Sequence, residues 1–347
     1  MSDNMDMVEL LNKIRSEAST LYQERVPEAD RNNMESIRYA MLDDGNVQVA
    51  NEFMNTLLNK LVKSIVHTKM FTNPLKPLKK GTKPLGDTIE EIYTNFIKAD
   101  QDAFNGENLF KRDLPDTNTV YHRMNLELQY PVTVNRTKLS KAFTSYESLE
   151  NYINSIINSL YNSAELDEFL NMKNLFKSAI DKKALKTVVV ADPLASKENA
   201  EEFITTVKTI SGLMKYPSKN YNSYTTAQSV DTEELLTFSR YDEQVLILPE
   251  AVNTKVDVSV LANTFNMTLA EFNKTRKILV DELPVENCVG ALVDEQFLQV
   301  YDDYYLITEF FNAKGLYTNY YLNIGQTMAY SILVNGVLFV TEEVVEA

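Results

Sequence analysis

The sequence predicts an α+β fold built around one long helix, and three patterns support this prediction. Between Ser145 and Lys182, apolar residues recur at three- and four-residue spacing with no proline or glycine, which predicts a continuous helix of about 36 residues. Residues 87–99 and 119–134 are rich in β-forming side chains and predict two long strands. The last third of the chain is strand-rich and aromatic, so we expect it to return beside the long helix.

The N-terminal part of the chain predicts an arm, a tether and a helix. Residues 5–22 place apolar side chains near helical spacing, and a polar, acidic run follows to about Gly45. We interpret this part as a short amphipathic arm on a loose tether. Residues 49–67 keep the spacing of a helix with one buried stripe. Pro74 and Pro77 then forbid helix, because proline lacks an N–H and forces its predecessor into extended geometry.

The segment between the two long strands predicts a hairpin that projects from the body. Residues 100–118 are polar and carry turn chemistry at Asn105-Gly106 and Pro115-Asp116. Beyond the long helix the pattern alternates between short strands and helices. The expected elements are a buried strand at 187–191, a helix from 197 to 212, a strand at 244–248 and a short helix at 256–265. Two segments have the form of a capping box, TSYE at 144–147 and TLAE at 268–271.

Composition bounds the function. A chain of 347 residues is expected to form two lobes rather than one core. With 34 basic and 49 acidic residues the net charge is −15, which disfavours nucleic-acid binding as the main role. The acidic balance fits either a wall that repels an enclosed duplex or simple solubility. The single cysteine excludes an intrachain disulfide, and no apolar run approaches a membrane span or a signal peptide.

No catalytic constellation stands out in the sequence. The segment GTKPLGDT at 81–88 resembles a phosphate-binding loop, but Asp87 stands where that loop requires lysine. Cys288 lies in an apolar strand pattern, and His67 and His122 fit packing or surface positions better than the role of a base. Adjacent acidic pairs are expected by chance at this composition, so they do not support acid–base chemistry or metal ligation. These pairs are Asp43-Asp44, Glu90-Glu91, Glu201-Glu202 and Asp302-Asp303.

Two long motifs carry a resemblance to a known family. They are NPLKPLKKGTKPLGDTIEEIYTNF at 73–96 and NSIINSLYNSAELDEFLNM at 154–172. Residues 256–267 and 300–328 show a weaker similarity to the same family. The sequences of these segments resemble those of the major capsid proteins of small short-tailed, protein-primed phages of the podovirus type. The resemblance spans roughly residues 50 to 340. It implies the Hong Kong 97-type capsid fold, with an N-terminal arm, an extended loop, a peripheral domain on a spine helix, and an axial domain.

Combining the resemblance with the residue patterns gives an expected domain plan. It places the N-terminal arm at 1–50, a helix and proline-rich connector at 51–86, the extended loop hairpin at 87–134, the peripheral domain at 135–190 plus 285–347, and the axial domain at 191–284. Some relatives carry an additional immunoglobulin-like C-terminal domain, and we expect this chain to lack it because it stops just after the strand NGVLFV.

The resemblance implies a shell protein without catalysis, cofactor or metal. Its expected partners are further copies of itself in hexamers and pentamers, a scaffolding protein, a portal or connector protein, and packaged double-stranded DNA contacted non-specifically, with no membrane. The expected location is the virion capsid, after synthesis in the host bacterial cytoplasm. Two alternatives remain open from the residues: another virion component such as a tail or adaptor protein, and a carboxylate-dependent cytoplasmic hydrolase.

Charged residues near the hairpin are the candidates for contacts between subunits. The lysines of residues 76–83 form the one local basic patch in an acidic chain, which favours pairing with an acidic neighbouring subunit or, alternatively, a solvated basic loop. The candidate contact residues are Lys76, Lys79, Lys80, Lys83, Asp102, Lys111, Arg112 and Asp113.

Overall fold

The computed structural model describes residues 7–30, 32–43, 47–63, 71–83, 88–97, 99, 112, 114–228, 235–256, 276–315 and 317–342. The chain divides into two compact units. Unit 1 contains the described residues within 1–73, 127–168 and 304–325, and unit 2 those within 74–126, 169–303 and 326–347. Helix α6 (Tyr146–Asp181) and strands β9 (Leu298–Asn312) and β10 (Tyr317–Tyr330) contribute residues to both units.

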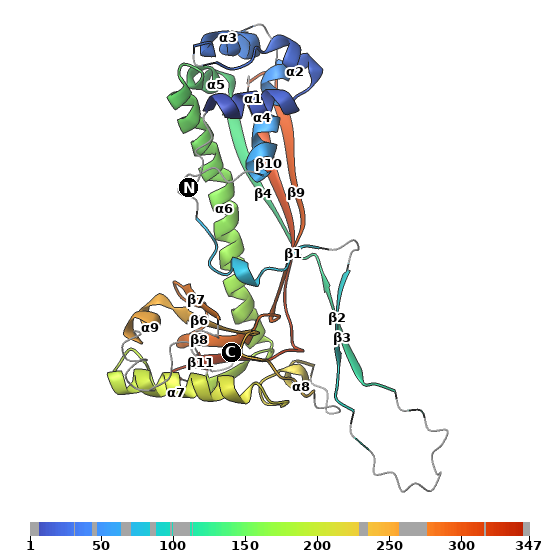
Figure 1. The fold of residues 1–347 in the computed structure, drawn as a ribbon, viewed down its shortest axis with the longest axis vertical. Coiled ribbons are helices and arrows are strands. Elements are labelled where there is room, and N and C mark those ends of the chain that lie inside the picture. Colours follow the sequence, from blue (N-terminus) through green and yellow to red (C-terminus); the bar gives the residue numbers. More distant parts are fainter. Residues whose placement is uncertain are drawn as a thin grey trace. The chain divides into compact units, whose positions relative to one another are not determined.

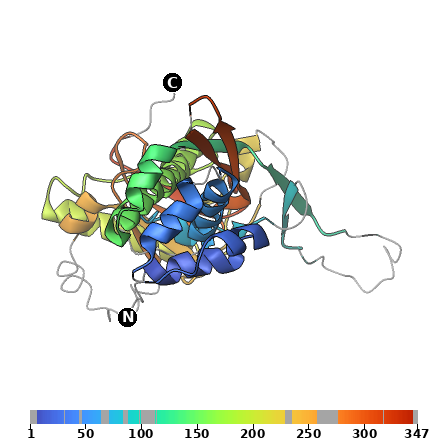
Figure 2. The same cartoon turned by 90° about the horizontal axis from the view of Figure 1, so that it is seen from above.

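Unit 1 is a group of helices packed on a sheet (Figure 1, Figure 2). Its helices are α1 (Met7–Glu17), α2 (Thr20–Arg25), α3 (Met34–Arg38), the π-helix η1 (Tyr39–Asp43), α4 (Val47–Lys63), α5 (Arg136–Ala142) and the first part of α6. Their apolar faces share one core with strand β10, in which Ile14, Phe53, Phe143, Leu160 and Tyr320 are fully or almost fully buried. Alternate residues of β10 enter this core because neighbouring side chains on a strand point to opposite faces.

The loose tether predicted after the first helix is wrong, because residues 20–43 fold into the core of unit 1. Tyr22, Ile37 and Met41 are buried there, and the Tyr22 hydroxyl contacts the Met41 Sδ atom at 3.6 Å. Ser19 caps α2 by accepting from the Tyr22 N–H, and its own hydroxyl donates to Glu52 on α4 at 2.8 Å. The apolar residues of this stretch are spread over several short helices, so no single period reveals them.

The strand predicted at 119–134 is two strands in two different sheets. β3 (Thr117–Arg123) pairs with β2 (Thr88–Thr94), whereas β4 (Leu126–Asn135) joins a four-stranded sheet of order β1-β9-β10-β4, in which β1 is Gly81–Thr82. Asn125 stands at the junction. Its side-chain amide donates to the Met328 carbonyl and accepts from the Met328 N–H, both at 2.8 Å. These two hydrogen bonds to the Met328 backbone divert the chain from one sheet to the other.

Unit 2 is built on a five-stranded sheet whose two faces are both covered (Figure 1). The strand order is β5 (Lys186–Val189), β11 (Gly336–Val340), β8 (Cys288–Asp294), β6 (Gln244–Pro249) and β7 (Arg276–Val280). Val245 and Ile247 face the second part of α6, while Leu246 and Leu248 face α7 (Lys197–Leu213). The predicted strands and the α7 helix are therefore confirmed. The expected helices at 256–265 and 268–271 lie outside the described residues, apart from Val256 at the end of α9 (Glu250–Lys255).

Helix α6 confirms the predicted long helix at 36 residues. Its start differs by one residue from the expected capping box, because the Ser145 hydroxyl accepts from the Ser148 N–H at 3.1 Å while Thr144 bonds back to the Lys141 carbonyl. Leu149 and Leu160 are buried in the core of unit 1, and Phe176 is buried in that of unit 2.

We predict that Ser159→Pro destabilises the protein by about 3 kcal/mol or more, because proline removes a helical N–H and clashes with the preceding turn. Ser159 is exposed in the middle of α6, so Ser159→Ala is the matched control and should be nearly neutral. Urea unfolding of both variants checks this. Equal stabilities would show that α6 is not needed as one continuous helix.

Candidate assembly surfaces

Three of the four lysines in the basic run hold their own segment onto unit 2. Lys79 Nζ lies 2.8 Å from Asp302, and Lys83 Nζ lies 2.9 Å from Asp303. Lys80 Nζ donates to the Glu295 backbone carbonyl at 2.7 Å. Burial lowers the pKa of Lys80, although the neighbouring Glu295 carboxylate opposes that effect. Their intrachain bonds define a structural role, and the predicted role in subunit contact stays a prediction.

The acidic pair on β9 explains how two lysines can be anchored side by side. Asp302 and Asp303 are adjacent on a strand, so their carboxylates point to opposite faces, and each meets one lysine. Gln326 also donates to Asp302, and Thr327 donates to Asp303 at 2.8 Å. No sequence pattern predicts these partners, because they are far from the lysines along the chain and one acidic pair resembles another.

The buried pair of Lys83 and Asp303 is predicted to matter for stability. Both side chains are less than a tenth exposed, at 7% and 9%. Lys83→Met should lower the free energy of unfolding by about 3 kcal/mol, because it leaves a buried carboxylate without its cation. Denaturant unfolding measures this, and adding Asp303→Asn should recover much of the loss.

Lys76→Gln, at an exposed position in the same segment, is the control, with an expected change within about 0.5 kcal/mol. Similar losses for Lys83→Met and Lys76→Gln would contradict the prediction.

The predicted hairpin is present as β2 and β3, which pair antiparallel from Thr88↔Arg123 to Thr94↔Thr117. One face is fastened to the rest of unit 2. The Tyr93 hydroxyl donates to the Leu236 carbonyl at 2.7 Å, and His122 Nε2 lies 3.0 Å from Glu91. Glu91 also accepts from the Ser331 hydroxyl. His122 is thus a packing residue of the hairpin base.

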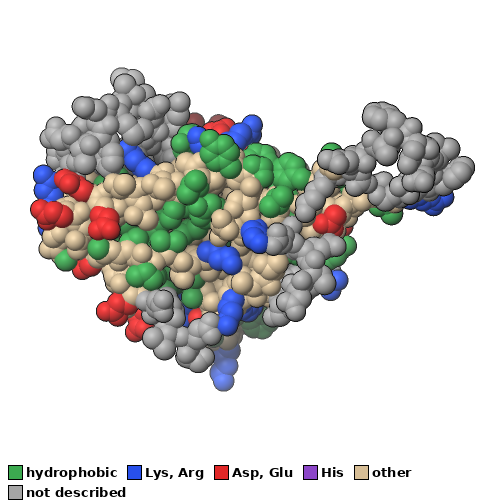
Figure 3. Space-filling model, turned by 90° about the horizontal axis from the view of Figure 1, so that it is seen from below, with side chains coloured by type: hydrophobic (Ala, Val, Ile, Leu, Met, Phe, Trp, Pro, Cys, Tyr) green, Lys and Arg blue, Asp and Glu red, His purple; other side chains and the backbone are tan. Residues whose placement is uncertain are grey.

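The opposite face of the hairpin is exposed and partly apolar. Ile92 is 58% exposed and Tyr121 is 62% exposed. Large hydrophobic side chains also lie on the surface elsewhere in unit 2, at Leu213, Tyr216 and Phe238. Figure 3 shows hydrophobic side chains grouped near the centre of one face, with acidic side chains toward its left side. Exposed apolar patches of this kind are typical of surfaces that other proteins cover.

Of the other candidate contact residues, Arg112 is exposed, whereas Asp102, Lys111 and Asp113 lie outside the described residues. His67 and the Asp87 position of the loop-like motif also lie outside them. Gly81 and Thr82 of that motif form β1 and pair with β9, in parallel with Tyr301 and Asp302.

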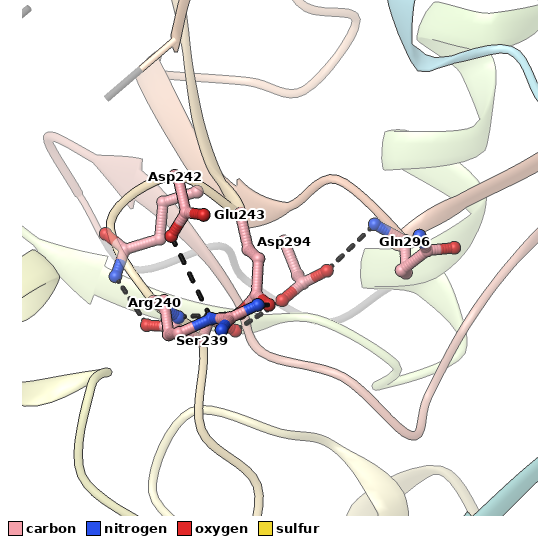
Figure 4. Close-up of polar contacts among 7 residues, drawn as sticks. Ser239, Arg240, Asp242, Glu243, Asp294 and Gln296 are labelled. Carbon is pink, nitrogen blue, oxygen red and sulfur yellow. Dashed lines mark hydrogen bonds and ion pairs between the residues drawn. The ribbon is translucent and has the colours of Figure 1, made fainter. Parts of the chain in front are cut away.

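A buried carboxyl network in unit 2 is the strongest cluster of titratable groups that sequence reasoning missed (Figure 4). Asp294, at the end of β8, accepts from the Ser239 hydroxyl at 2.5 Å and from the Gln296 N–H at 2.8 Å. Burial raises the pKa of Asp294, and the nearby Glu243 carboxylate adds to the rise. Arg240 instead binds Glu243, at 2.6 Å between Nη2 and Oε1.

Within the described residues, this network lacks the imidazole of a Ser–His–Asp arrangement. Asp294 and Ser239 have hydrogen-bond partners from backbone and side chains but no imidazole among them. Burial raises the pKa of Cys288 to about 12, so its sulfur is a thiol at neutral pH. The part of the chain that the structure describes holds no group of three or more histidine, cysteine or acidic side chains placed to bind a metal ion. Nor does a helix in that part have the length and apolar character needed to cross a membrane.

Asp294 should make stability fall as pH rises. Its raised pKa means that the folded state holds the proton more tightly than the unfolded chain, so stability is lost as pH rises from near 3.8 through the raised pKa. Asp294→Asn keeps an acceptor for the Gln296 N–H and lacks this loss.

The melting temperature of Asp294→Asn minus that of wild type should therefore increase between about pH 4 and pH 7. Asp242→Asn is the control, because that carboxylate is 77% exposed in the neighbouring turn. A difference between Asp294→Asn and wild type that does not change with pH would refute the buried-carboxyl assignment.

The structure has the fold of a phage capsid shell protein. The structure is similar to a chain from the capsid structure of Staphylococcus phage Andhra, with a TM-score of 0.64, 14% sequence identity, and coverage of 81% of this chain and 87% of that chain. The α+β elements and this similarity confirm the predicted Hong Kong 97-type fold.

Sequence comparison identifies the family. Residues 11–340 match the family described as Phi29-like phage major capsid protein, and the chain belongs to that family. The major capsid protein of Bacillus phage PZA is 32% identical over 342 residues, which cover 97% of this chain and 73% of that relative. The major capsid protein of Bacillus phage B103 is 32% identical over 345 residues, which cover 98% and 74%. The chain is thus a phage major capsid protein, as the motifs predicted, and neither the tail nor the hydrolase alternative gains support.

Proposed function

We propose that copies of this chain tile as hexamers and pentamers into an icosahedral or prolate head that encloses double-stranded DNA, and that the chain has no catalytic activity. The match to a capsid protein family over residues 11–340 is the observation that carries the proposal. Self-association follows from the role of a capsid protein. The buried Cys288 thiol and the histidine-free Asp294 network also fit a structural role better than a catalytic one.

The partners follow from the same role. A scaffolding protein guides the curvature of the shell, and a portal or connector protein occupies one vertex, after synthesis in the host cytoplasm. A net charge of −15 opposes tight binding to phosphates, so contacts with packaged DNA are non-specific. The same charge makes the copies repel one another, which places their contacts on neutral or locally basic surfaces.

The hairpin and the segment before it supply such surfaces. The exposed apolar face around Ile92 and Tyr121 is suited to a neighbouring subunit, because its other face is already fastened to unit 2. In the basic run, Lys79, Lys80 and Lys83 hold the segment in place through intrachain bonds, and Lys76 is at an exposed position. Arg112 is exposed, and we propose that it belongs to the same contact together with Asp102, Lys111 and Asp113.

Imaging tests the proposal directly. The protein is expressed alone and together with a scaffolding protein from the same phage, and both preparations are examined by negative-stain electron microscopy and sedimentation. Closed shells in at least one preparation are expected. Monomers or small oligomers in both, at high protein concentration, would reject the proposal.

Lys76→Gln should weaken assembly through charge rather than folding. Its melting temperature should equal that of wild type, while the protein concentration needed for shells rises by roughly severalfold at low salt and less at high salt, because salt screens exposed charges. Lys177→Gln is the matched control, an exposed lysine on α6 whose loss changes the net charge equally. If both variants behave alike, the effect is one of net charge and the contact at Lys76 is excluded.

A further inference from the structure

Among the described residues, one edge of the four-stranded sheet has a long stretch with no strand beside it. β1 pairs with β9 only at Tyr301 and Asp302. Beyond that point, within the part of the chain that the structure describes, β9 has β10 on one side and no strand on the other. Residues 306–312 therefore have no described strand beside them and present a row of backbone N–H and C=O groups along this edge. Such a row is a template for another strand.

The side chains of this edge do not protect it. Folded proteins usually guard an edge with lysine, proline, a bulge or a short strand. Residues 304–312 contain no lysine and no proline, and Glu309 is their only charged residue. Tyr304, Leu306 and Phe310 are 38%, 55% and 65% exposed.

The opposite edge of the same sheet is guarded. There β4 carries Pro131 in its middle, and proline is tolerated in a sheet only where its missing N–H faces away from the ladder. The β4 edge is thus protected against pairing with another strand, whereas the β9 edge is suited to such pairing.

Hydrogen bonds show which residues of β9 lie on its exposed face. The Asn323 amide donates to the Thr308 hydroxyl at 3.1 Å, and Gln129 donates to Asn323 at 2.7 Å. The Tyr304 ring lies over Gly325, where a Cβ atom would come within 2.3 Å of it. By alternation, Leu306 and Phe310 point to this same face.

We propose that β9 pairs antiparallel with β9 of a second copy of this chain, about a two-fold axis at Thr308, so that two sheets join into one. This inference rests on the proposed assembly into shells. A two-fold contact uses the same patch twice, so the strand must complement itself. Around Thr308 it does, because Leu306 meets the second copy's Phe310 on the exposed face.

The charges agree with this register. In it, Glu309 stands opposite Ile307 and not opposite the second copy's Glu309, which avoids a like-charge pair directly across the strands. The central pair is Thr308 with Thr308, whose hydroxyls are able to hydrogen-bond across the axis. Shells of an acidic protein need contacts of this kind, because charged surfaces resist close approach.

Cysteine crosslinking tests the register. In a Cys288→Ala background, Thr308→Cys shells treated with diamide should yield covalent dimers on the order of tenfold more than Thr133→Cys shells, because a disulfide requires Cα atoms about 4.4–6.8 Å apart. Thr133 is the control, an exposed threonine on the guarded edge strand β4 of the same sheet. Equal yields, or none from Thr308→Cys, would overturn the proposed pairing.

Hydrogen exchange on the wild type gives a second measurement that depends on no substitution. Outward-facing amides within 304–312 should exchange roughly tenfold more slowly in shells than in free subunits, with those of 127–134 unchanged. Slow exchange without the Thr308→Cys dimer means that another strand covers β9, and it overturns the two-fold pairing. If the wild type forms no shells, the proposed function fails, and Thr308→Cys crosslinking of the concentrated free protein decides the pairing on its own.

Discussion

One helix, α6, contributes to the hydrophobic cores of both units. α6 supplies Leu149, Ile153, Ile156 and Leu160 to the core of unit 1 and Phe169, Met172 and Phe176 to that of unit 2. At 100° per residue, these two stripes lie about 160° apart around the helix axis. The helix therefore has no single apolar face along its full length. A break in it would remove buried area from two cores at once, which is why its unbroken sequence is a constraint on the whole fold.

The long helix and the sheet strands could be predicted because burial of particular faces sets a regular spacing of apolar residues along each of them. β6 is buried on both faces and reads as a continuous apolar run, and α7 has a stripe and a serine cap. The predictions failed where tertiary partners decide the structure. Nothing local shows that Asn125 binds the Met328 backbone, so the alternating run by itself predicts one strand. The short helices of residues 20–43 likewise bury residues too unevenly spaced to reveal a period.

The same distinction applies to the assembly surface. Motif resemblance identified the family, and the lysine cluster was visible as the one basic patch of an acidic chain. The sequence could not show that Lys79 and Lys83 bind Asp302 and Asp303, because ion pairs across distant segments leave no spacing signal. It also could not distinguish the two edges of one sheet. That distinction needs the strand order, which places Pro131 on one edge and residues 304–312 on the other.

A shell protein has to satisfy opposing electrostatic demands. A charge of −15 on every copy favours solubility before assembly and penalises close contact during it. On the solvent face of the four-stranded sheet, the Tyr304 hydroxyl donates to the Glu127 carboxylate at 3.5 Å. Elsewhere on that face part of the conflict is resolved, because further hydrogen bonds join neutral side chains. They link Thr133 to Asn319, and Gln129 through Asn323 to Thr308. These groups satisfy one another within the subunit and carry no charge to repel a neighbour, so the backbone edge and apolar side chains beside them are free to determine which strand pairs there.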